Sequence, residues 1–336
     1  MTTITAESET TSAGPDGSRD AQRSGRLAVL LLSPTVLVLA LVIGYPIVAA
    51  LRESLYERGQ GLDAQGFVVE GDRFVGLSHY VDIFTGPVAS VFWNAFWNTS
   101  FFTVTTVAIE TVLGVAMALV MHQAFRGRGL VRASILVPWA IPTAVSALLW
   151  RWVFQADGVA NALLGRQILW TTEGFQAKAA VIIADTWKTA PFIGLLVLAG
   201  LQLIPREVYE AARVDGAGGR QQFWRITLPL VKPVLLVAVL FRMLDVLRMF
   251  DLPFVLIGAQ KRSVETLSMV AFNEASNLRY GPAAAMATVL FLYVAVVAYA
   301  FVKLLGADIL GQVREQRTVT WGRPRQRVPV RQEVPA

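Results

Sequence analysis

Six long apolar runs constrain the fold of this chain more than any other feature. They lie at 27–51, 93–121, 133–150, 179–204, 233–257 and 283–302. Each is long enough, as a helix, to cross a hydrocarbon core about 30 Å thick. Since the chain is 54% hydrophobic and only 16% charged, we predict an all-α membrane protein with six transmembrane helices.

The segments that flank these runs are polar and lack an apolar period. Residues 1–26 are rich in Ser, Thr, Gly and Asp, which predicts a disordered cytoplasmic tail. The first run is too long for the core of a signal peptide and lacks a cleavage pattern, so it is expected to remain as a span. We therefore expect the six-helix domain at 27–310 and a basic cytoplasmic tail at 311–336.

The distribution of Lys and Arg predicts the orientation of the spans. With the N-terminus inside, 18 of these residues face the cytoplasm and 9 face the other side. The bias predicts that both termini lie in the cytoplasm, and we expect a multi-pass protein of the plasma membrane. The bias also explains the net charge of +6 without nucleic acid. The longer segment 56–91 is then extracytoplasmic, with a short strand or cap expected near 67–69.

A polar segment at 205–229 separates the fourth and fifth runs. Pro205 can open a first helix, Gly216 permits a reversal, and Pro229 is expected to limit a second helix. The segment thus predicts a cytoplasmic helix-turn-helix. Phe223 and Trp224 are apolar side chains of the kind that anchor partner proteins.

The sequence gives no sign of catalysis. There is no cysteine, and two histidines do not readily supply a zinc site. No Walker A pattern, HExxH or G-x-S-x-G occurs. We expect a non-enzymatic chain with no cofactor of its own, so that ATP and Mg²⁺ are handled by other chains.

Charged side chains inside the runs are expensive, so they are expected to face a cavity or a partner. In the fifth run, Asp245 lies three residues from Arg242 and from Arg248, and Arg248 lies three from Asp251. Four charges can then pair along one helix. The stripe either neutralises itself and joins two helices, or lines a path for a sugar, whose hydroxyls suit charged hydrogen bonds.

Two further polar groups lie in the third and fourth runs. Asp185 and Lys188 are three residues apart, which allows them to pair with each other or to bind a ligand beside Trp187. Trp139 and Thr143 flank Pro142, where a broken helix would free backbone groups to face a cavity.

Several of these motifs resemble one family. The pattern E-A-A, three residues, Gly, nine residues, Ile-x-Leu-Pro begins at Glu210 and resembles the cytoplasmic coupling loop of permease subunits in bacterial ABC importers. Residues 27–310 resemble the larger permease of carbohydrate importers of the maltose type, on segments 75–80, 138–142, 187–192 and 250–251. The likeness is strongest over 181–254, where residues 240–245 are similar to permeases of actinobacterial trehalose importers.

The resemblance implies a type I ABC importer permease fold, in which segment 205–229 is the coupling loop. It implies a permease subunit that carries a sugar, such as the disaccharides trehalose or maltose, by alternating access. Implied sugar contacts are Trp139, Thr143, Asp185, Trp187, Lys188, Thr189, Asp245 and Arg248. Implied contacts with an ATPase are Glu210, Ala211, Ala212, Asp215, Gly216 and Phe223.

The implied partners are a second six-helix permease in a heterodimer, two ATPase subunits, an extracytoplasmic sugar-binding protein or lipoprotein, and membrane lipid. Two alternatives remain open. One is an ABC permease for another solute, such as glycerol phosphate, a peptide or an amino acid. The other is an ion-coupled secondary transporter, for which Glu110 is the candidate carboxylate, although no clear inverted repeat is present.

Overall fold

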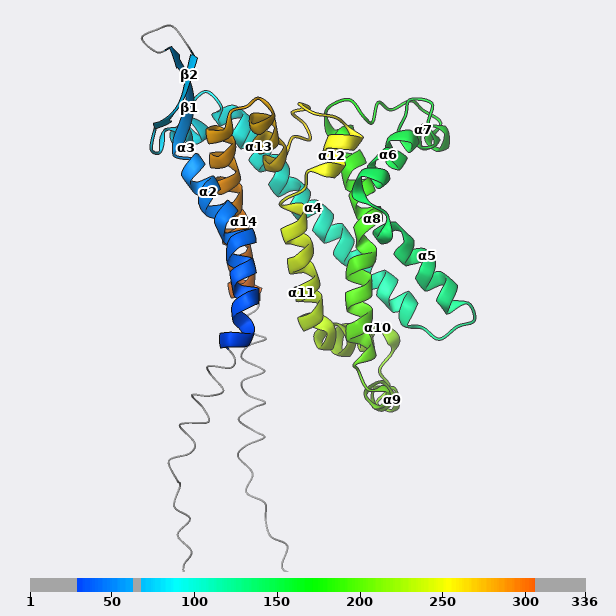
Figure 1. The fold of residues 1–336 in the computed structure, drawn as a ribbon. Helices are drawn as coiled ribbons and strands as arrows, with labels where there is room; N and C mark the ends of the chain where they lie inside the picture. The colour runs from blue at the N-terminus through cyan, green and yellow to red at the C-terminus, as the bar shows by residue number, and fades with distance from the viewer. Residues whose placement is uncertain (1–28, 63–67, 306–336) are drawn as a thin grey trace, which may run out of the picture. The chain divides into compact units, whose positions relative to one another are not determined.

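The computed structural model describes residues 29–62 and 68–305, mostly as helices (Figure 1). The predicted tails at 1–26 and 311–336 lie outside the described residues. The chain divides into two compact units, one up to Glu53 and the other from Ser54 onward.

The described part of the first unit is one helix, Val29–Glu53, which corresponds to the predicted first span. It contains a π-helical turn, η1 (Ala40–Gly44), followed by α2 (Tyr45–Glu53). Pro46 comes just after the π turn. A proline lacks the N–H of the helical ladder and its ring presses on the carbonyl four residues back, so the wider π turn lets the helix continue.

The second unit begins with an antiparallel hairpin, β1 (Tyr56–Leu62) and β2 (Val68–Phe74), and the short helix α3 (Ser78–Phe84). Tyr56 pairs with Phe74 at the base, where the two ring centroids lie 5.4 Å apart. The sequence predicted a strand only near 67–69. It missed the first strand because Gly59 and Gly61 favour turns.

Long helices form the body of the second unit. They are α4 (Ala89–His122), α8 (Phe175–Gln202), α11 (Leu228–Val246) and α14 (Tyr280–Leu305). The first three contact one another and lie side by side (Figure 1). A Cβ atom on Gly114 of α4 would lie 2.7 Å from the Cβ of Ile193 on α8. Glycine therefore allows these helices to pack closely.

The predicted third span is broken. Its halves are α5 (Arg128–Ala140) and α6 (Thr143–Val153), which meet at an angle of 98°. The break expected at Pro142 is confirmed, and the helices on either side of it extend beyond the predicted run 133–150. The short helix α7 (Val159–Leu164) follows.

The fifth span begins and ends at other residues than the predicted run 233–257. It begins earlier, because α10 (Gly219–Gln222) and the π turn η2 (Phe223–Thr227) run without interruption into α11. Pro229 therefore does not end the second short helix as predicted, since η2 accommodates it as η1 accommodates Pro46. The span also ends earlier: α11 stops at Val246, and a separate helix, α12 (Asp251–Leu256), follows.

The remaining helices are α9 (Arg206–Val214), which precedes α10, and α13 (Leu267–Ser276). Among the described residues, five helices are long and apolar enough to span a membrane, or six if the bent α5–α6 pair counts as one span. The prediction of a helical protein with this number of spans is confirmed.

Candidate functional site

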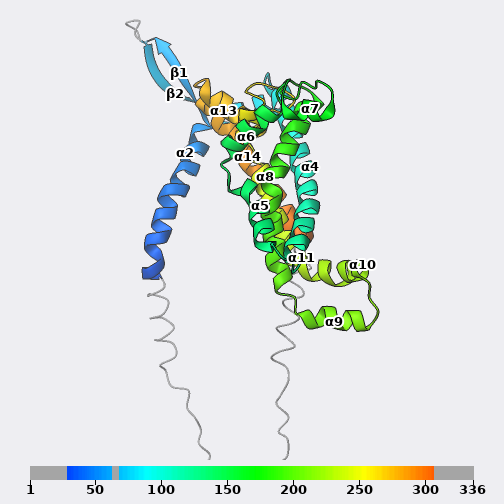
Figure 2. The ribbon, with the colours of Figure 1, turned by 90° about the vertical axis from the view of Figure 1, so that its right-hand side faces the viewer.

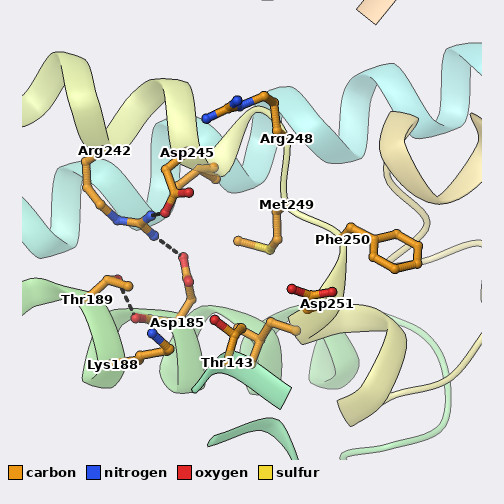
Figure 3. A pocket seen from close by; sticks show the side chains of 12 residues that line it. Thr143, Asp185, Lys188, Thr189, Arg242, Asp245, Arg248, Met249, Phe250 and Asp251 are labelled. Atoms are coloured by element: carbon orange, nitrogen blue, oxygen red, sulfur yellow. Dashed lines mark hydrogen bonds and ion pairs between the residues drawn. The ribbon is translucent and has the colours of Figure 1, made fainter. Parts of the chain in front are cut away.

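A polar pocket of about 140 Å³ lies where the two helix breaks meet (Figure 3). Thr143 comes from the first residue of α6, Asp185 and Lys188 come from α8, and the end of α11 with the start of α12 closes the other side. Both breaks leave backbone groups without helical partners, which suits a cavity for polar ligands. The lining residues are Thr143, Asp185, Lys188, Thr189, Arg242, Asp245, Val246, Arg248, Met249, Phe250, Asp251 and Leu252.

Arg242 is the buried centre of the charge network beside this pocket. Its Nε atom lies 2.6 Å from Glu110 Oε2, and its Nη2 atom lies 2.5 Å from Asp185 Oδ2. Nη1 forms an ion pair with Asp245. Thr189 Oγ1 donates a hydrogen bond of 2.5 Å to Glu110 Oε1. One guanidinium thus joins α4, α8 and α11, a task that its planar set of donors fits.

The four-charge stripe predicted along one helix is wrong except for its first pair. Arg242 and Asp245 do pair, but α11 ends before Arg248. The Nε atom of Arg248 donates to the carbonyl oxygen of Leu244 at 3.1 Å. Within residues 29–62 and 68–305, no ion pair joins Arg248 to Asp245 or to Asp251.

The possible pair between Asp185 and Lys188 is also absent. Asp185 binds Arg242 instead. Lys188 is 9% exposed and lines the pocket, and no hydrogen bond or ion pair joins it to another residue in the described part of the chain. The largely buried side chain of Lys188 therefore brings its ammonium to the pocket without a direct hydrogen-bond or ion-pair partner among the described residues.

Six of the eight residues predicted to contact substrate line the pocket: Thr143, Asp185, Lys188, Thr189, Asp245 and Arg248. The two tryptophans do not. Trp187 lines a separate apolar groove of about 570 Å³, where its ring lies 5.7 Å from that of Trp150. Trp139 stacks on Phe192 at 6.0 Å. A substrate contact remains a prediction for all eight residues.

Sequence reasoning did not include Glu110 and Arg242 in the site. Glu110 is the single charge in the second run and is fully buried. A carboxylate at membrane depth needs a cationic or hydrogen-bonding partner. That rule signals that a partner exists, but it does not say which of several cations, 132 residues away, will provide it.

The predicted coupling loop, 205–229, contains the short helix α9 and the start of the long helix that begins at α10, at the end of the helices opposite α7 (Figure 2). Gly216 has φ +77°. The Gly216 N–H donates to Arg213 O and the Ala217 N–H to Ala212 O, which is a Schellman motif closing α9. The predicted glycine turn is therefore confirmed.

The residues predicted to contact an ATPase differ in exposure. Glu210, Ala211, Asp215 and Gly216 are exposed, Phe223 is half-buried and Ala212 is buried. Trp224, which was not in that set, is 60% exposed. Their contacts with a partner remain predictions.

Comparison with known proteins gives a consistent family. Residues 110–311 match the family described as "Binding-protein-dependent transport system inner membrane component". The chain is 37% identical over 278 residues to the Trehalose/maltose transport system permease protein MalF of Thermococcus litoralis, covering 81% of this chain and 91% of that one. It is 35% identical over 312 residues to the Trehalose transport system permease protein SugA of Mycobacterium tuberculosis, covering 93% and 98%.

The fold is also similar to a solved structure. A chain of a bacterial ABC transporter involved in the import of the acidic polysaccharide alginate superposes with a TM-score of 0.70 at 21% identity, covering 84% of this chain and 96% of that chain. At that identity the likeness concerns the fold alone. Together with the family match over more than half of the chain, it shows that this protein belongs to the binding-protein-dependent transport system inner membrane components, as a multi-pass ABC importer permease.

Proposed function

We propose that this permease carries a sugar, such as trehalose or maltose, through an ATP-driven importer. The observation that supports this best is the polar pocket at the two helix breaks. It places the donors of Lys188 and Thr143 beside the carboxylate acceptors of Asp185 and Asp245. A sugar hydroxyl both donates and accepts, so this mixture suits it, and two relatives are named for trehalose transport.

The size of the pocket supports a second permease subunit. Its volume of about 140 Å³ is below the roughly 300–1,000 Å³ typical of ligand pockets. We infer that a heterodimeric partner, a second six-helix permease, supplies the rest of the site. In this proposal an extracytoplasmic sugar-binding protein or lipoprotein delivers the sugar, and the family's description as binding-protein-dependent supports a partner of this kind.

Other chains supply the energy for transport, by hydrolysing ATP. Two ATPase subunits bind ATP and Mg²⁺ and dock on the coupling loop, so this chain catalyses nothing itself. The loop then lies in the cytoplasm with both termini. Exposed Glu210, Asp215 and Trp224 are the docking contacts that the geometry favours.

The charge balance of the pocket argues against the alternative solutes. Three aspartates, at 185, 245 and 251, and three cations, at 188, 242 and 248, line the pocket, and Glu110 adds a fourth carboxylate bound to Arg242. A neutral polyhydroxyl ligand fits this balance better than glycerol phosphate. Glu110 is already bound by Arg242 and Thr189, so it is a poor candidate for the ion-coupling carboxylate of a secondary transporter.

The test is uptake of radiolabelled trehalose, maltose and glycerol phosphate by cells that express this chain with its partner permease, ATPases and binding protein. We expect energy-dependent uptake of at least one disaccharide, and its loss when this chain is omitted. Lys188→Ala should reduce uptake at an equal membrane level. Uptake of glycerol phosphate alone, or disaccharide uptake that persists without this chain, contradicts the proposal.

A further inference from the structure

Asp185 lies between two cations, and only one of them binds it. Arg242 reaches it from α11, with 2.5 Å between Nη2 and Oδ2. Lys188 is three residues along α8, a spacing at which an aspartate and a lysine ordinarily can pair. The view of the pocket shows both cations beside the carboxylate (Figure 3).

The neighbours of Arg242 explain why it holds the carboxylate. Glu110 accepts from Nε at 2.6 Å and from Nη2 at 3.0 Å, which fixes the plane of the guanidinium. Glu110 is itself oriented by Thr189, and Nη1 pairs with Asp245. A planar guanidinium held in this way is pre-organised for Asp185, whereas the ammonium of Lys188 sits on a flexible chain and loses more freedom when it pairs.

Because Arg242 binds Asp185, Lys188 does not pair with that carboxylate. Its side chain lines the pocket and has no direct hydrogen bond or ion pair with any other described residue. An ammonium has three donors, and in the pocket these donors are open to a ligand or to water. Lys188 is therefore available to a ligand because Arg242 occupies Asp185.

We propose that Arg242, held by Glu110, is a positioning residue that prevents the Asp185–Lys188 pair and so keeps Lys188 free to donate to a sugar. The inference rests on the proposed function and goes beyond it, because neither Glu110 nor Arg242 need touch the substrate. If the guanidinium is withdrawn, Asp185 turns to Lys188 and the pocket loses a donor and an acceptor together.

The first test is Arg242→Lys, measured on the purified transporter complex without its binding protein, so that capture by that protein does not mask the site. The probes are labelled trehalose and labelled maltose. One ammonium does not reproduce the contacts of a guanidinium with three carboxylates, so Asp185 is released to Lys188. We expect the Kd to rise at least about tenfold, the loss of one charged hydrogen bond.

The decisive variant is Arg242→Lys with Asp185→Asn. Asparagine keeps an acceptor oxygen but does not hold Lys188 by charge, so the ammonium is free again. We expect the Kd to fall at least about threefold from that of Arg242→Lys, without reaching the wild-type value, because an amide oxygen is a weaker acceptor for the sugar than a carboxylate. The Tm of each variant is measured beside its Kd. A purely structural role for Arg242, in which Asp185→Asn only relieves an uncompensated buried charge, predicts that Kd and Tm recover together. The positioning role predicts that the Kd recovers even where the Tm does not.

A second pair of variants covers the case in which Arg242→Lys does not assemble. Arg242→Met with Glu110→Gln removes one cation and one anion together, and Asp185→Asn is then added to it. We expect the Kd for the sugars to rise in the first variant and to fall again when Asp185→Asn is added. The matched control is Arg73→Met with Glu57→Gln, which removes an exposed hairpin ion pair of 2.8 Å and should leave the Kd unchanged.

The outcomes separate the two proposals. If the wild-type complex binds and transports neither sugar, the proposed function fails and the inference fails with it. If the wild type binds sugar but the Arg242 variants keep its Kd, or Asp185→Asn restores nothing in either background, only the positioning role is overturned.

Discussion

Arg242 is a buried cation shared by three carboxylates, and these do not contribute equally to stability. The side chains of Glu110 and Asp185 are 0% and 7% exposed, whereas that of Asp245 is 67% exposed. Removing one member of a buried ion pair leaves an uncompensated charge in a medium that solvates it poorly. An exposed pair contributes little by comparison.

We therefore predict that Glu110→Ala destabilises the protein by up to about 3–5 kcal/mol, while Asp245→Ala changes stability by about 1 kcal/mol or less. Thermal denaturation of the purified protein and immunoblotting of membranes measure both. Equal losses from the two substitutions would contradict the network described here.

Glu265 offers a prediction about pH, because it lies outside the membrane spans in the segment before α13. It is 7% exposed, and burial raises the pKa of its carboxyl above the ordinary 4.5, opposed by nearby Arg262. The folded state then binds the proton more tightly than the unfolded state. Its contribution to stability is present below about pH 4.5 and is lost as pH rises through the folded-state pKa.

Glu265→Gln should remove this pH dependence, since glutamine keeps an acceptor for Asn273, whose Nδ2 lies 3.5 Å from Glu265 Oε1. We expect the Tm of the wild type to fall relative to the variant between about pH 4.5 and neutrality. Exposed Glu57 provides the control, as Glu57→Gln. If the Tm values of the wild type and of Glu265→Gln change with pH in the same way, the pKa of Glu265 is not raised by burial.

Sequence spacing predicted the residue contacts that lie within one turn and missed those between helices. The Arg242–Asp245 pair followed from a separation of three residues. The contact of Arg242 with Glu110 spans 132 positions, and depends on how α4 and α11 pack. The Asp185–Lys188 pair was equally compatible with the spacing, and it fails because a better cation from another helix competes.

Among the helices, a local sequence signal predicted one of the two breaks, and the other depends on a contact between distant segments. Pro142 pointed to the break between α5 and α6. The break after Val246 also has a proline signal, because Pro253 in a continuous helix would press on the carbonyl of Met249. That carbonyl instead accepts from Thr266 Oγ1 at 2.8 Å, a contact that only the folded chain provides.

The turn of the predicted coupling loop depends on one glycine. Gly216 has φ +77°, a conformation that a β-branched residue adopts only at a cost of about 1–3 kcal/mol. We expect Gly216→Val to distort the end of α9. The protein should still insert into membranes, while the assembled complex loses sugar-stimulated ATP hydrolysis.

Gly218 is the matched control for that substitution. Its φ is −69°, and no atom lies within 4 Å of an added Cβ. Gly218→Ala should therefore leave stimulation intact. Full stimulation in the Gly216→Val complex would show that the turn is not needed for coupling.

For the whole molecule, the apolar runs predicted the number of spans because lipid requires each spanning segment to satisfy its own backbone. They did not predict where helices bend or begin, since α10, η2 and α11 form one helix through Pro229. The polar pocket could be anticipated from its charged residues. That Trp187 lies outside it could not, because Trp187 and Lys188 are adjacent on α8 and line different cavities. Nor could the position of Trp139, whose ring on α5 stacks on Phe192 of α8.

The orientation of the chain in the membrane is directly measurable, because the sequence contains no cysteine. Lys and Arg are twice as numerous on one side, 18 against 9, which predicts a cytoplasmic coupling loop and an extracytoplasmic hairpin. Asp72 in β2 and Arg220 in α10 are both exposed, so each accepts a cysteine without disturbing packing. In intact cells, a membrane-impermeant maleimide should label Asp72→Cys and leave Arg220→Cys unlabelled until the membrane is opened. The cysteine-free wild type controls for background, and labelling in the reverse order would place the coupling loop on the wrong side for any cytoplasmic ATPase.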